Sequence, residues 1–311
     1  MAEDDTRLHY GGQAVIEGVM IRGPRSMAVS CRRPDGSIAS YSQELKGLFT
    51  GHVREMAFVR GILVLAETLV LGIRTLNFSS NIQIGASEEQ ARQAGASMWA
   101  SLAFALVVGI AIFFVGPVLA THWLHGHISS PHVVVALEGL LRVGIFVGYI
   151  WAIGFVPDVR RVFAYHGAEH KTIHAYEAGQ PLTVENIQRF SPAHPRCGTS
   201  FLLVVALASI FVFVLLGELD LSRLLLSRIL FVPVLAAIAY EVIRVGGGHQ
   251  HIPLVRFLFR PNLALQSFTT RQPTDDMVEV AVHALERVIA TEASMARSGE
   301  IEPDEGAVAI S

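Results

Sequence analysis

Long uninterrupted apolar runs dominate the hydrophobic pattern of this chain. Residues 98–120 contain no charged side chain, and about 20 apolar residues are what a helix needs to cross the core of a bilayer. Residues 132–156 make a second such run, and residues 201–217 make a third that is short but wholly apolar. A fourth covers residues 229–245. The pattern therefore predicts four transmembrane helices.

Charged residues inside two of these runs indicate where the helices meet other parts of the protein. Glu138 and Arg142 lie four residues apart in the second run, a spacing at which opposite charges on a helix meet and reduce each other's cost in a membrane. The fourth run contains Pro233, Glu241 and Arg244. Its far end is therefore expected to reach the membrane interface or to face the protein interior.

The overall composition agrees with a membrane protein. Of the 311 residues, 51% are hydrophobic and only 16% are charged, which is too apolar for an ordinary soluble fold. The lipid bilayer is therefore the expected partner, and nucleic acid is not. Association into a homo-oligomer stays open.

The placement of lysine and arginine predicts the orientation, because short loops rich in positive charge stay on the cytoplasmic side. The 121–131 connection has neither residue, whereas the 157–200 connection has five. Arg223 and Arg228 in the 218–228 connection are a mild objection. We expect the protein in the cytoplasmic (inner) membrane, with both termini and the 157–200 connection in the cytoplasm. The first residues are polar and show no cleavable signal peptide, so insertion is expected to begin at an internal span.

The segments outside the spans carry weaker but readable patterns. Apolar alternation after residue 10, broken by the turn signal Pro34-Asp35-Gly36, predicts a small antiparallel sheet. Residues 55–77 are apolar at a helical period but are interrupted by charges, which is typical of an interfacial helix. A helix that starts after Pro273 has one apolar stripe and is expected to pack on the sheet.

These patterns predict an α-helical polytopic membrane protein with about four transmembrane helices. A small cytoplasmic α+β region is built from the N-terminal segment, the central loop and the C-terminal helix. The expected segments in chain order are a flexible N-terminus (1–9), a β-rich segment (10–54), an interfacial helix and connector (55–97), two spans (98–156), a cytoplasmic histidine-rich loop (157–200), two spans (201–245), a linker and amphipathic helix (246–296) and a disordered tail (297–311).

The histidine-rich loop carries the strongest chemical signal. His166, His170 and His174 recur every four residues, so on a helix they share one face, with Glu169 beside them. The run also fits H-x-x-E-H, in which two histidines hold zinc and the glutamate serves as general base. We therefore predict His166 and His170 as ligands of a divalent metal, zinc being favoured, and Glu169 as the catalytic base. The alternative is a polar helix whose histidines are solvated or hydrogen-bonded.

The third ligand is left open by the sequence. An irregular turn with two prolines brings His194 and Cys197 back toward the first histidines, and a cytoplasmic location leaves Cys197 free of any disulfide. Glu241 is attractive because a carboxylate in an apolar helix is costly unless it is paired or coordinated. It could equally pair with Arg244. Glu17 is a fourth candidate.

Several separate motifs stand in order along residues 10–290. They are GGQAVIEGVMIRGP, YHGAEHKTIHAYE, LTVEN, HPRCGTSFLL, PVLAAIAYEVIR and FTTRQPTDDMVEVA. Together they resemble the YqhQ-like family of bacterial membrane proteins, a domain of unknown function commonly described as predicted metal-dependent enzymes. The resemblance implies metal dependence through the histidine motif. The chain departs from the family pattern at His174, where an apolar residue is expected, and at Gln272, where an acidic one is.

The residues and the resemblance together favour a metal-dependent, hydrolase-like enzyme with its site at the cytoplasmic membrane face. Positive charge from Arg22, Lys171 and Arg196 suits a phosphate-bearing lipid, and a membrane-proximal peptide fits H-x-x-E-H equally well. A non-catalytic scaffold or assembly factor is the first alternative. A small transporter, suggested by the charges inside the spans, is the second.

Overall fold

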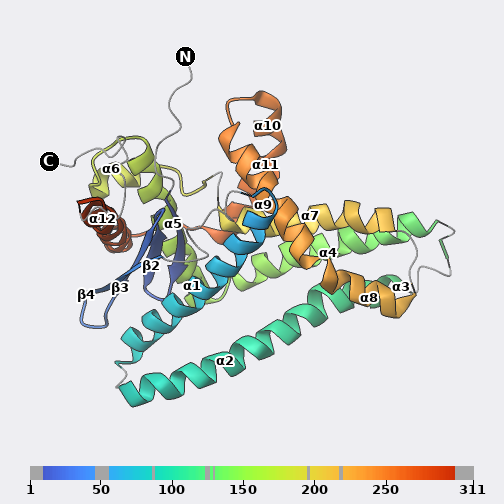
Figure 1. Cartoon of the computed structure of the whole chain (residues 1–311), viewed down its shortest axis with the longest axis horizontal. Coiled ribbons are helices and arrows are strands. Elements are labelled where there is room, and N and C mark those ends of the chain that lie inside the picture. The colour runs from blue at the N-terminus through green and yellow to red at the C-terminus, as the bar shows by residue number, and fades with distance from the viewer. Residues whose placement is uncertain are drawn as a thin grey trace.

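The computed structural model describes residues 10–45, 56–85, 88–122, 127–128, 130–194, 197–216 and 220–297 (Figure 1). Its architecture combines a small sheet, covered by helices, with a set of long apolar helices that extend away from it. The expected flexible N-terminus and nearly all of the expected disordered tail lie outside the described residues.

The sheet is an antiparallel meander of four strands in the order β1-β2-β3-β4. The strands are β1 (Gly11–Val15), β2 (Gly18–Arg22), β3 (Ser26–Arg32) and β4 (Ile38–Glu44). Gly36 adopts a φ of 87° in the turn between β3 and β4, a conformation that favours glycine. The predicted sheet and its Pro34-Asp35-Gly36 turn are therefore confirmed.

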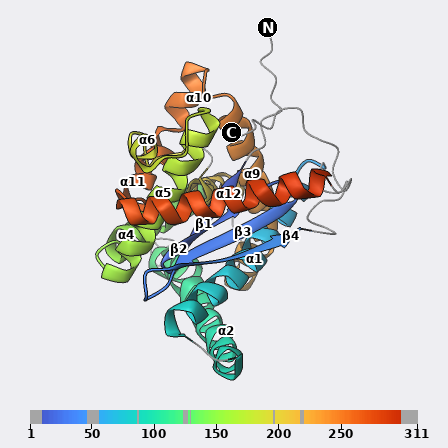
Figure 2. The ribbon, with the colours of Figure 1, turned by 90° about the vertical axis from the view of Figure 1, so that its left-hand side faces the viewer.

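Helices cover both faces of this sheet. On one face, α5 (Pro157–Glu177) and α12 (Asp275–Arg297) bury an apolar core against the strands, and Figure 2 shows α12 lying across them. On the other face, α1 (Val59–Ile84) contributes Leu71 to a second core with Val15 and Met27. The prediction that the C-terminal helix packs on the sheet is confirmed. The N-terminal segment, the central loop and the C-terminal helix thus form one folded unit.

Three stretches in the described part of the chain are long and apolar enough to cross a membrane. They are Trp99–Thr121, His132–Ile153 and Gly198–Leu216. The first runs through α2 (Glu88–Ile110), the π-helical segment η3 (Ala111–Val115) and α3 (Gly116–His122), and the others coincide with α4 (Pro131–Ile153) and α7 (Gly198–Leu216).

The fourth expected span, residues 229–245, is not among these three stretches, and a break between two helices falls near its start. The chain is divided between α8 (Leu221–Leu230) and α9 (Val232–Gly248), with the break at Phe231 and Pro233 in the first turn of α9. Proline has no N–H to donate to the carbonyl four residues earlier, and its ring crowds that carbonyl, so a continuous helix is interrupted before it. The sequence identified the helix but not the break.

Glu138 and Arg142 pair as their spacing predicted, and a third charge joins them. The side chain of Arg228 in α8 donates to both carboxylate oxygens of Glu138, at 3.0 and 2.8 Å, and lies 3.7 Å from the centre of the Phe213 ring. The three charged residues are all at least nine-tenths buried. Arg228 is therefore part of a buried network and not a free charge of a loop, which removes part of the objection that it raised to the orientation.

After α9, the structure has two further helices where a flexible linker was expected. These are α10 (Pro253–Leu258) and α11 (Arg260–Thr269). Within the central loop, α6 (Val184–Gln188) begins where Thr183 caps it, accepting a 3.4 Å hydrogen bond from the N–H of Asn186.

Candidate metal centre

The histidines of the central loop lie on α5, as their spacing predicted. Pro157 stands in the first turn, where its missing N–H costs nothing, and Asp158 favours the positive end of the helix dipole. Most of the helix from Ala164 to Ala175 is buried. One side of α5 packs on the sheet, and the histidines occupy another side, which faces the segment before α7 and the end of α11.

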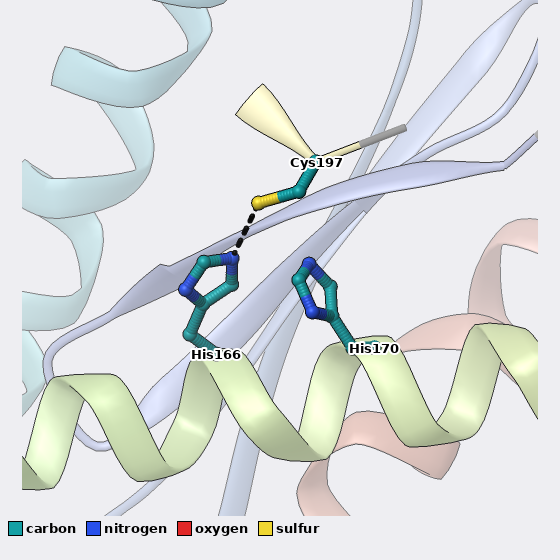
Figure 3. A group of neighbouring side chains, drawn as sticks. All are labelled: His166, His170 and Cys197. Atoms are coloured by element: carbon teal, nitrogen blue, oxygen red, sulfur yellow. Dashed lines mark hydrogen bonds between the residues drawn. The ribbon is translucent and has the colours of Figure 1, made fainter. Parts of the chain in front are cut away.

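His166, His170 and Cys197 converge at this helix. One ligand atom from each lies within 4.8 Å of the other two, and no second cluster of this kind occurs among the described residues. The two imidazole rings are 4.3 Å apart between centroids. Figure 3 shows Cys197 facing the two rings from a different segment, with its Sγ 3.3 Å from Nε2 of His166. Two nitrogens and one sulfur therefore share one small space.

Backbone carbonyls fix the orientation of both imidazoles. Nδ1 of His166 donates to the carbonyl oxygen of Thr269 at 2.8 Å, and Nδ1 of His170 donates to that of Pro192 at 2.5 Å. Because a carbonyl only accepts, each Nδ1 carries a proton, and in the neutral ring each Nε2 keeps its lone pair. Hydrogen bonding of the other ring nitrogen in this way is the usual support of a metal-binding histidine.

Cys197 stands immediately before α7. Its Sγ accepts from the N–H of Thr199 at 3.4 Å, and the Thr199 hydroxyl lies 3.1 Å away. The side chain is only 4% exposed. Cys31 is different, since it is buried in the sheet and burial raises the pKa of its thiol to about 12. Of the two cysteines, Cys197 is therefore the one placed to act as a ligand.

Glu169 lies beside the cluster, on the side of the sheet. The side chain is 3% exposed, and one carboxylate oxygen is 3.6 Å from Nε2 of His170. Burial raises the pKa of Glu169, and the neighbouring His166 and His194 act in the opposite direction. The backbone N–H of Gly12 in β1 donates to the carboxylate. A carboxyl group with a raised pKa, next to the candidate ligands, can take up or release a proton.

His194 and His174 form an extension of the cluster. Their rings are 4.4 Å apart, and Nε2 of His194 lies 3.3 Å from the carboxylate of Glu177. His194 is held by Gln266, whose amide accepts from its N–H and donates to its carbonyl, both at 2.8 Å. Burial lowers the pKa of His174 to about 4, which keeps that ring neutral. Neither histidine belongs to the three-atom cluster, so they surround the site without completing it.

Two of the proposed third ligands have other partners. Glu241 was expected beside the histidines, but its carboxylate accepts from the guanidinium of Arg60 in α1, with Nε 2.7 Å from Oε1, and from the N–H of Phe58. The pairing follows from the packing of α9 on α1, which brings an arginine to Glu241 from 181 residues away. Glu17 is paired with Arg161, and the hydroxyl of Tyr165 donates to it at 3.2 Å.

Two of the expected substrate-binding charges, Arg22 and Lys171, have other partners in the structure. Arg22 is paired with Glu67 of α1 at 2.9 Å. Lys171 is 2% exposed and donates from Nζ to the carbonyl of Gln188 at 2.8 Å, which ties α5 to α6. Arg196 lies outside the described residues.

Sequence reasoning missed the residues that support the site. Thr269 and Pro192 act through their backbone carbonyls, so their side chains carry no signal. Gly12 carries a faint one, as a glycine in a strand can mark a close approach of another group. A Cβ at this position would lie 2.6 Å from Cγ of Glu169. Only a residue without a side chain fits between β1 and this carboxylate.

The three donors suit a divalent metal ion. Two neutral imidazole nitrogens and one thiolate form a donor set that zinc accepts in tetrahedral sites, with the fourth position left for water or substrate. Both imidazoles are pre-oriented by backbone carbonyls, and the sulfur lies 3.3 Å from Nε2 of His166. The residues present therefore fit a zinc ion.

Fold and cluster define a helical protein with a small sheet, three long apolar stretches, and a His–His–Cys cluster beside the start of α7. The chain belongs to the family described as Protein of unknown function (DUF1385), whose family model matches residues 56–291. It is 36% identical over 299 residues to Uncharacterized protein YqhQ of Bacillus subtilis (strain 168), covering 91% of this chain and 93% of that protein. No solved structure matches. The expected YqhQ-like family is confirmed, and neither description names an activity.

Proposed function

We propose that this protein is an integral membrane protein that holds a divalent metal ion, favouring zinc, through His166, His170 and Cys197 at the cytoplasmic face of the cell membrane. We propose further that it uses the site as a hydrolase-like enzyme. The observation that carries the proposal is the convergence of three ligand atoms within 4.8 Å of one another, two imidazole nitrogens and one sulfur. The Nδ1 atoms of both imidazoles are already bonded to backbone carbonyls.

The long apolar helices support the placement in a membrane. Large apolar side chains on α7 are open to the surroundings, Phe211 being 72% and Leu215 86% exposed. In water such a surface is unfavourable, whereas in lipid it has a matching solvent. The absence of lysine and arginine from residues 121–131, against five in residues 157–200, supports the cytoplasmic location of the cluster.

The packing of the sheet supports four crossings. The strands precede the first apolar stretch, α5 follows the second, and α12 comes after the third, yet α5 and α12 pack on one face of the same sheet. Three crossings alone would leave α12 on the opposite side of the bilayer from the strands. We therefore propose that the chain returns after α7, through the broken pair α8 and α9.

The side chains of the site have distinct roles in the proposed reaction. A bound zinc ion would supply Lewis-acid activation of water and of a polarised carbonyl or phosphoryl oxygen. Glu169 would accept a proton from water and return it to the leaving group, a role that suits a carboxyl group whose pKa is raised by burial. The carbonyls of Thr269 and Pro192 hold the imidazoles in the tautomer that this arrangement requires.

The substrate class follows from position more than from charge. The cluster lies where α7 begins and α11 ends, at the junction between the sheet and the apolar helices. An ester or amide bond at the membrane surface, in a lipid headgroup or a membrane-proximal peptide, would be within reach. Since Arg22 and Lys171 are engaged elsewhere, they add no preference for a phosphate.

Metal analysis of the detergent-purified protein tests the proposal. Wild type is expected to carry about one zinc ion per chain, and His166→Ala/His170→Ala and Cys197→Ala are each expected to lose it. Cys31→Ala is the matched control, because Cys31 is also a buried free cysteine but lies in the sheet, so its metal content should equal that of wild type. If wild type holds no stoichiometric metal when purified with zinc present, the metal site is refuted.

A non-catalytic scaffold is the second candidate, and the same hydrogen bonds favour it. The bonds from His166 to Thr269 and from His170 to Pro192 join α5 to two other segments without any metal. On this hypothesis the alanine variants lose thermal stability while wild type binds no metal, a combination that the metal analysis distinguishes from the enzyme. The transporter alternative loses support, because Glu138, Arg142 and Glu241 are engaged in ion pairs.

A further inference from the structure

A helical arm, made of α10 and α11 in direct succession with only Phe259 between them, projects from the body of the molecule beside the candidate metal centre. Figure 1 shows α11 at the end of the long apolar helices that is nearer the sheet, with α10 further out. The inner part of α11 packs on the ends of α4 and α7, where Leu265 joins Ile150 and Leu203 in one apolar cluster. Ile150 is near the end of α4 and Leu203 near the start of α7, so α11 crosses both helices at the level of the site.

The outer helix, α10, buries none of its residues. Three of its six residues are large, apolar and open to the surroundings, with exposures of 66% for Leu254, 60% for Phe257 and 62% for Leu258. An exposed apolar cluster at the tip of the projecting helical arm is unfavourable in water and indicates a partner surface.

The charge of this region is of one sign. Residues 242–274 contain four arginines and neither aspartate nor glutamate. Two of the arginines, Arg256 and Arg260, belong to the helical arm itself, and the guanidinium of Arg260 lies 5.5 Å from the centre of the Phe257 ring. Exposed apolar side chains next to arginines, in a segment without acidic residues, are typical of helices that lie in the interface of an anionic membrane.

We propose that α10 docks on the cytoplasmic leaflet of the membrane in which the protein resides, and that the occupant of its surface is anionic phospholipid. Leu254, Phe257 and Leu258 enter the boundary between headgroups and acyl chains, while Arg256 and Arg260 pair with headgroup phosphates. This inference rests on the proposed membrane placement. It is supported by the packing of the helical arm on the ends of α4 and α7 and by the complementarity of its charge to anionic lipid.

The docked helical arm would also set the position of the metal centre. Helix α11 ends at Thr269, whose carbonyl orients His166. The side-chain amide of Gln266 in α11 holds the backbone of His194 and donates to the hydroxyl of Ser200 at 2.9 Å. A helix fixed in the interface at α10 thus holds the His–His–Cys cluster at the depth of the headgroups. That is the depth at which an ester or amide bond of a membrane substrate is found.

Depth-dependent fluorescence quenching in nanodiscs tests the docking. An environment-sensitive fluorophore is attached to Leu254→Cys in the full-length protein, and lipids with spin labels on their acyl chains serve as quenchers. Phe211→Cys on α7 is the membrane control, and Tyr41→Cys, 44% exposed on β4, is the aqueous control. The unsubstituted protein, whose two cysteines are buried, gives the background labelling.

The expected result is quenching at position 254 from labels near the headgroups, strong quenching at position 211 from deeper labels, and none at position 41. If position 254 behaves like position 41 while position 211 is quenched, the docking is refuted and the membrane placement stands. If position 211 is not quenched, the membrane placement itself is refuted and the docking falls with it.

The choice of lipid gives a second readout. Spin-labelled phosphatidylglycerol should quench position 254 more than spin-labelled phosphatidylcholine at equal content. Each arginine near an anionic surface contributes roughly a fivefold preference. The Arg256→Gln/Arg260→Gln variant is therefore expected to lose most of this excess, while the control at position 211 keeps its ratio. Equal quenching of position 254 by both lipids, with Arg256 and Arg260 intact, would overturn the assignment of anionic phospholipid.

Discussion

Substitution of Gly12 by alanine tests whether Glu169 is held in place by the first strand of the sheet. A Cβ at Gly12 would lie 2.6 Å from Cγ and 2.8 Å from Oε1 of Glu169, and 2.8 Å from the backbone oxygen of Met20. Ordinary contacts between such atoms are about 3.5–4.0 Å, so the carboxylate must retreat by roughly 1 Å. Gly11 is the matched control, because a Cβ there meets no atom within 4 Å.

The expected cost of Gly12→Ala is about 1–3 kcal/mol of unfolding free energy, the usual range for an overpacked site. For a protein of this size, thermal unfolding in detergent should show a decrease of a few degrees, roughly 2–4 °C per kcal/mol. Gly11→Ala should stay within about 0.5 kcal/mol of wild type. Zinc content should not change, because none of the three proposed ligands is touched.

The functional readout separates the position of Glu169 from its charge. A displacement of about 1 Å in a catalytic group costs up to about a hundredfold in rate. In a complementation assay, Gly12→Ala should therefore resemble Glu169→Gln, and Gly11→Ala should resemble wild type. Equal stability and equal complementation for the two glycine variants would refute the contact between β1 and Glu169. Loss of zinc from Gly12→Ala alone would instead make Glu169 part of the metal site.

Three further predictions address other ionisable residues of the protein. Glu138→Gln leaves two buried arginines with a neutral partner, so the unfolding free energy in detergent should fall by about 3–5 kcal/mol; an unchanged unfolding temperature would contradict the buried network. Glu241→Gln should lower the stability by about 1–2 kcal/mol through its lost ion pair with Arg60, while elemental analysis finds unchanged zinc; a metal-free variant would restore Glu241 as a ligand. His174 has a pKa lowered from 6.5 to about 4, so the stability it contributes is complete above pH 6.5 and is lost as the pH falls toward 4. Between these pH values, wild type should lose about 1–2 kcal/mol more than His174→Leu, after allowance for the partial exposure of the ring, and parallel pH profiles would refute the burial effect.

The local patterns of the sequence predicted most of the secondary structure. The four-residue spacing of the histidines, the turn at Pro34-Asp35-Gly36 and the apolar stripe after Pro273 all act within one element or between neighbours. Hydrophobic periodicity and turn chemistry are visible at that range. The long apolar runs were equally clear.

The partners of charged residues were much less predictable. Arg60 and Glu241 are 181 residues apart, and Arg22 and Glu67 are 45 apart, so no local pattern connects them. The expectation that Glu241 needs a partner was sound, since its carboxylate is paired. The identity of that partner depends on how α1 packs against α9, which periodicity does not encode.

The third donor illustrates the same limit from the other side. The turn before α7 indicated that His194 and Cys197 return toward α5, and both do. Only Cys197 joins the three-atom cluster, because His194 is held by Gln266 and lies toward Glu177. The sequence specified the return of the chain, whereas the choice between the two side chains depends on a glutamine 72 residues further on.

The assembly of the cluster from distant segments has a consequence for biosynthesis. His166 and His170 are made well before Cys197, and the carbonyl of Thr269 comes last. Ribosomes add about 5–20 residues per second, so the histidines precede Thr269 by roughly 5–20 s. During that interval the nascent chain has the H-x-x-E-H motif without the geometry that orients it. Metal loading would therefore be a late event of biogenesis that follows insertion of α7 and completion of α11, and a nascent chain released before α11 would carry the motif but no formed site.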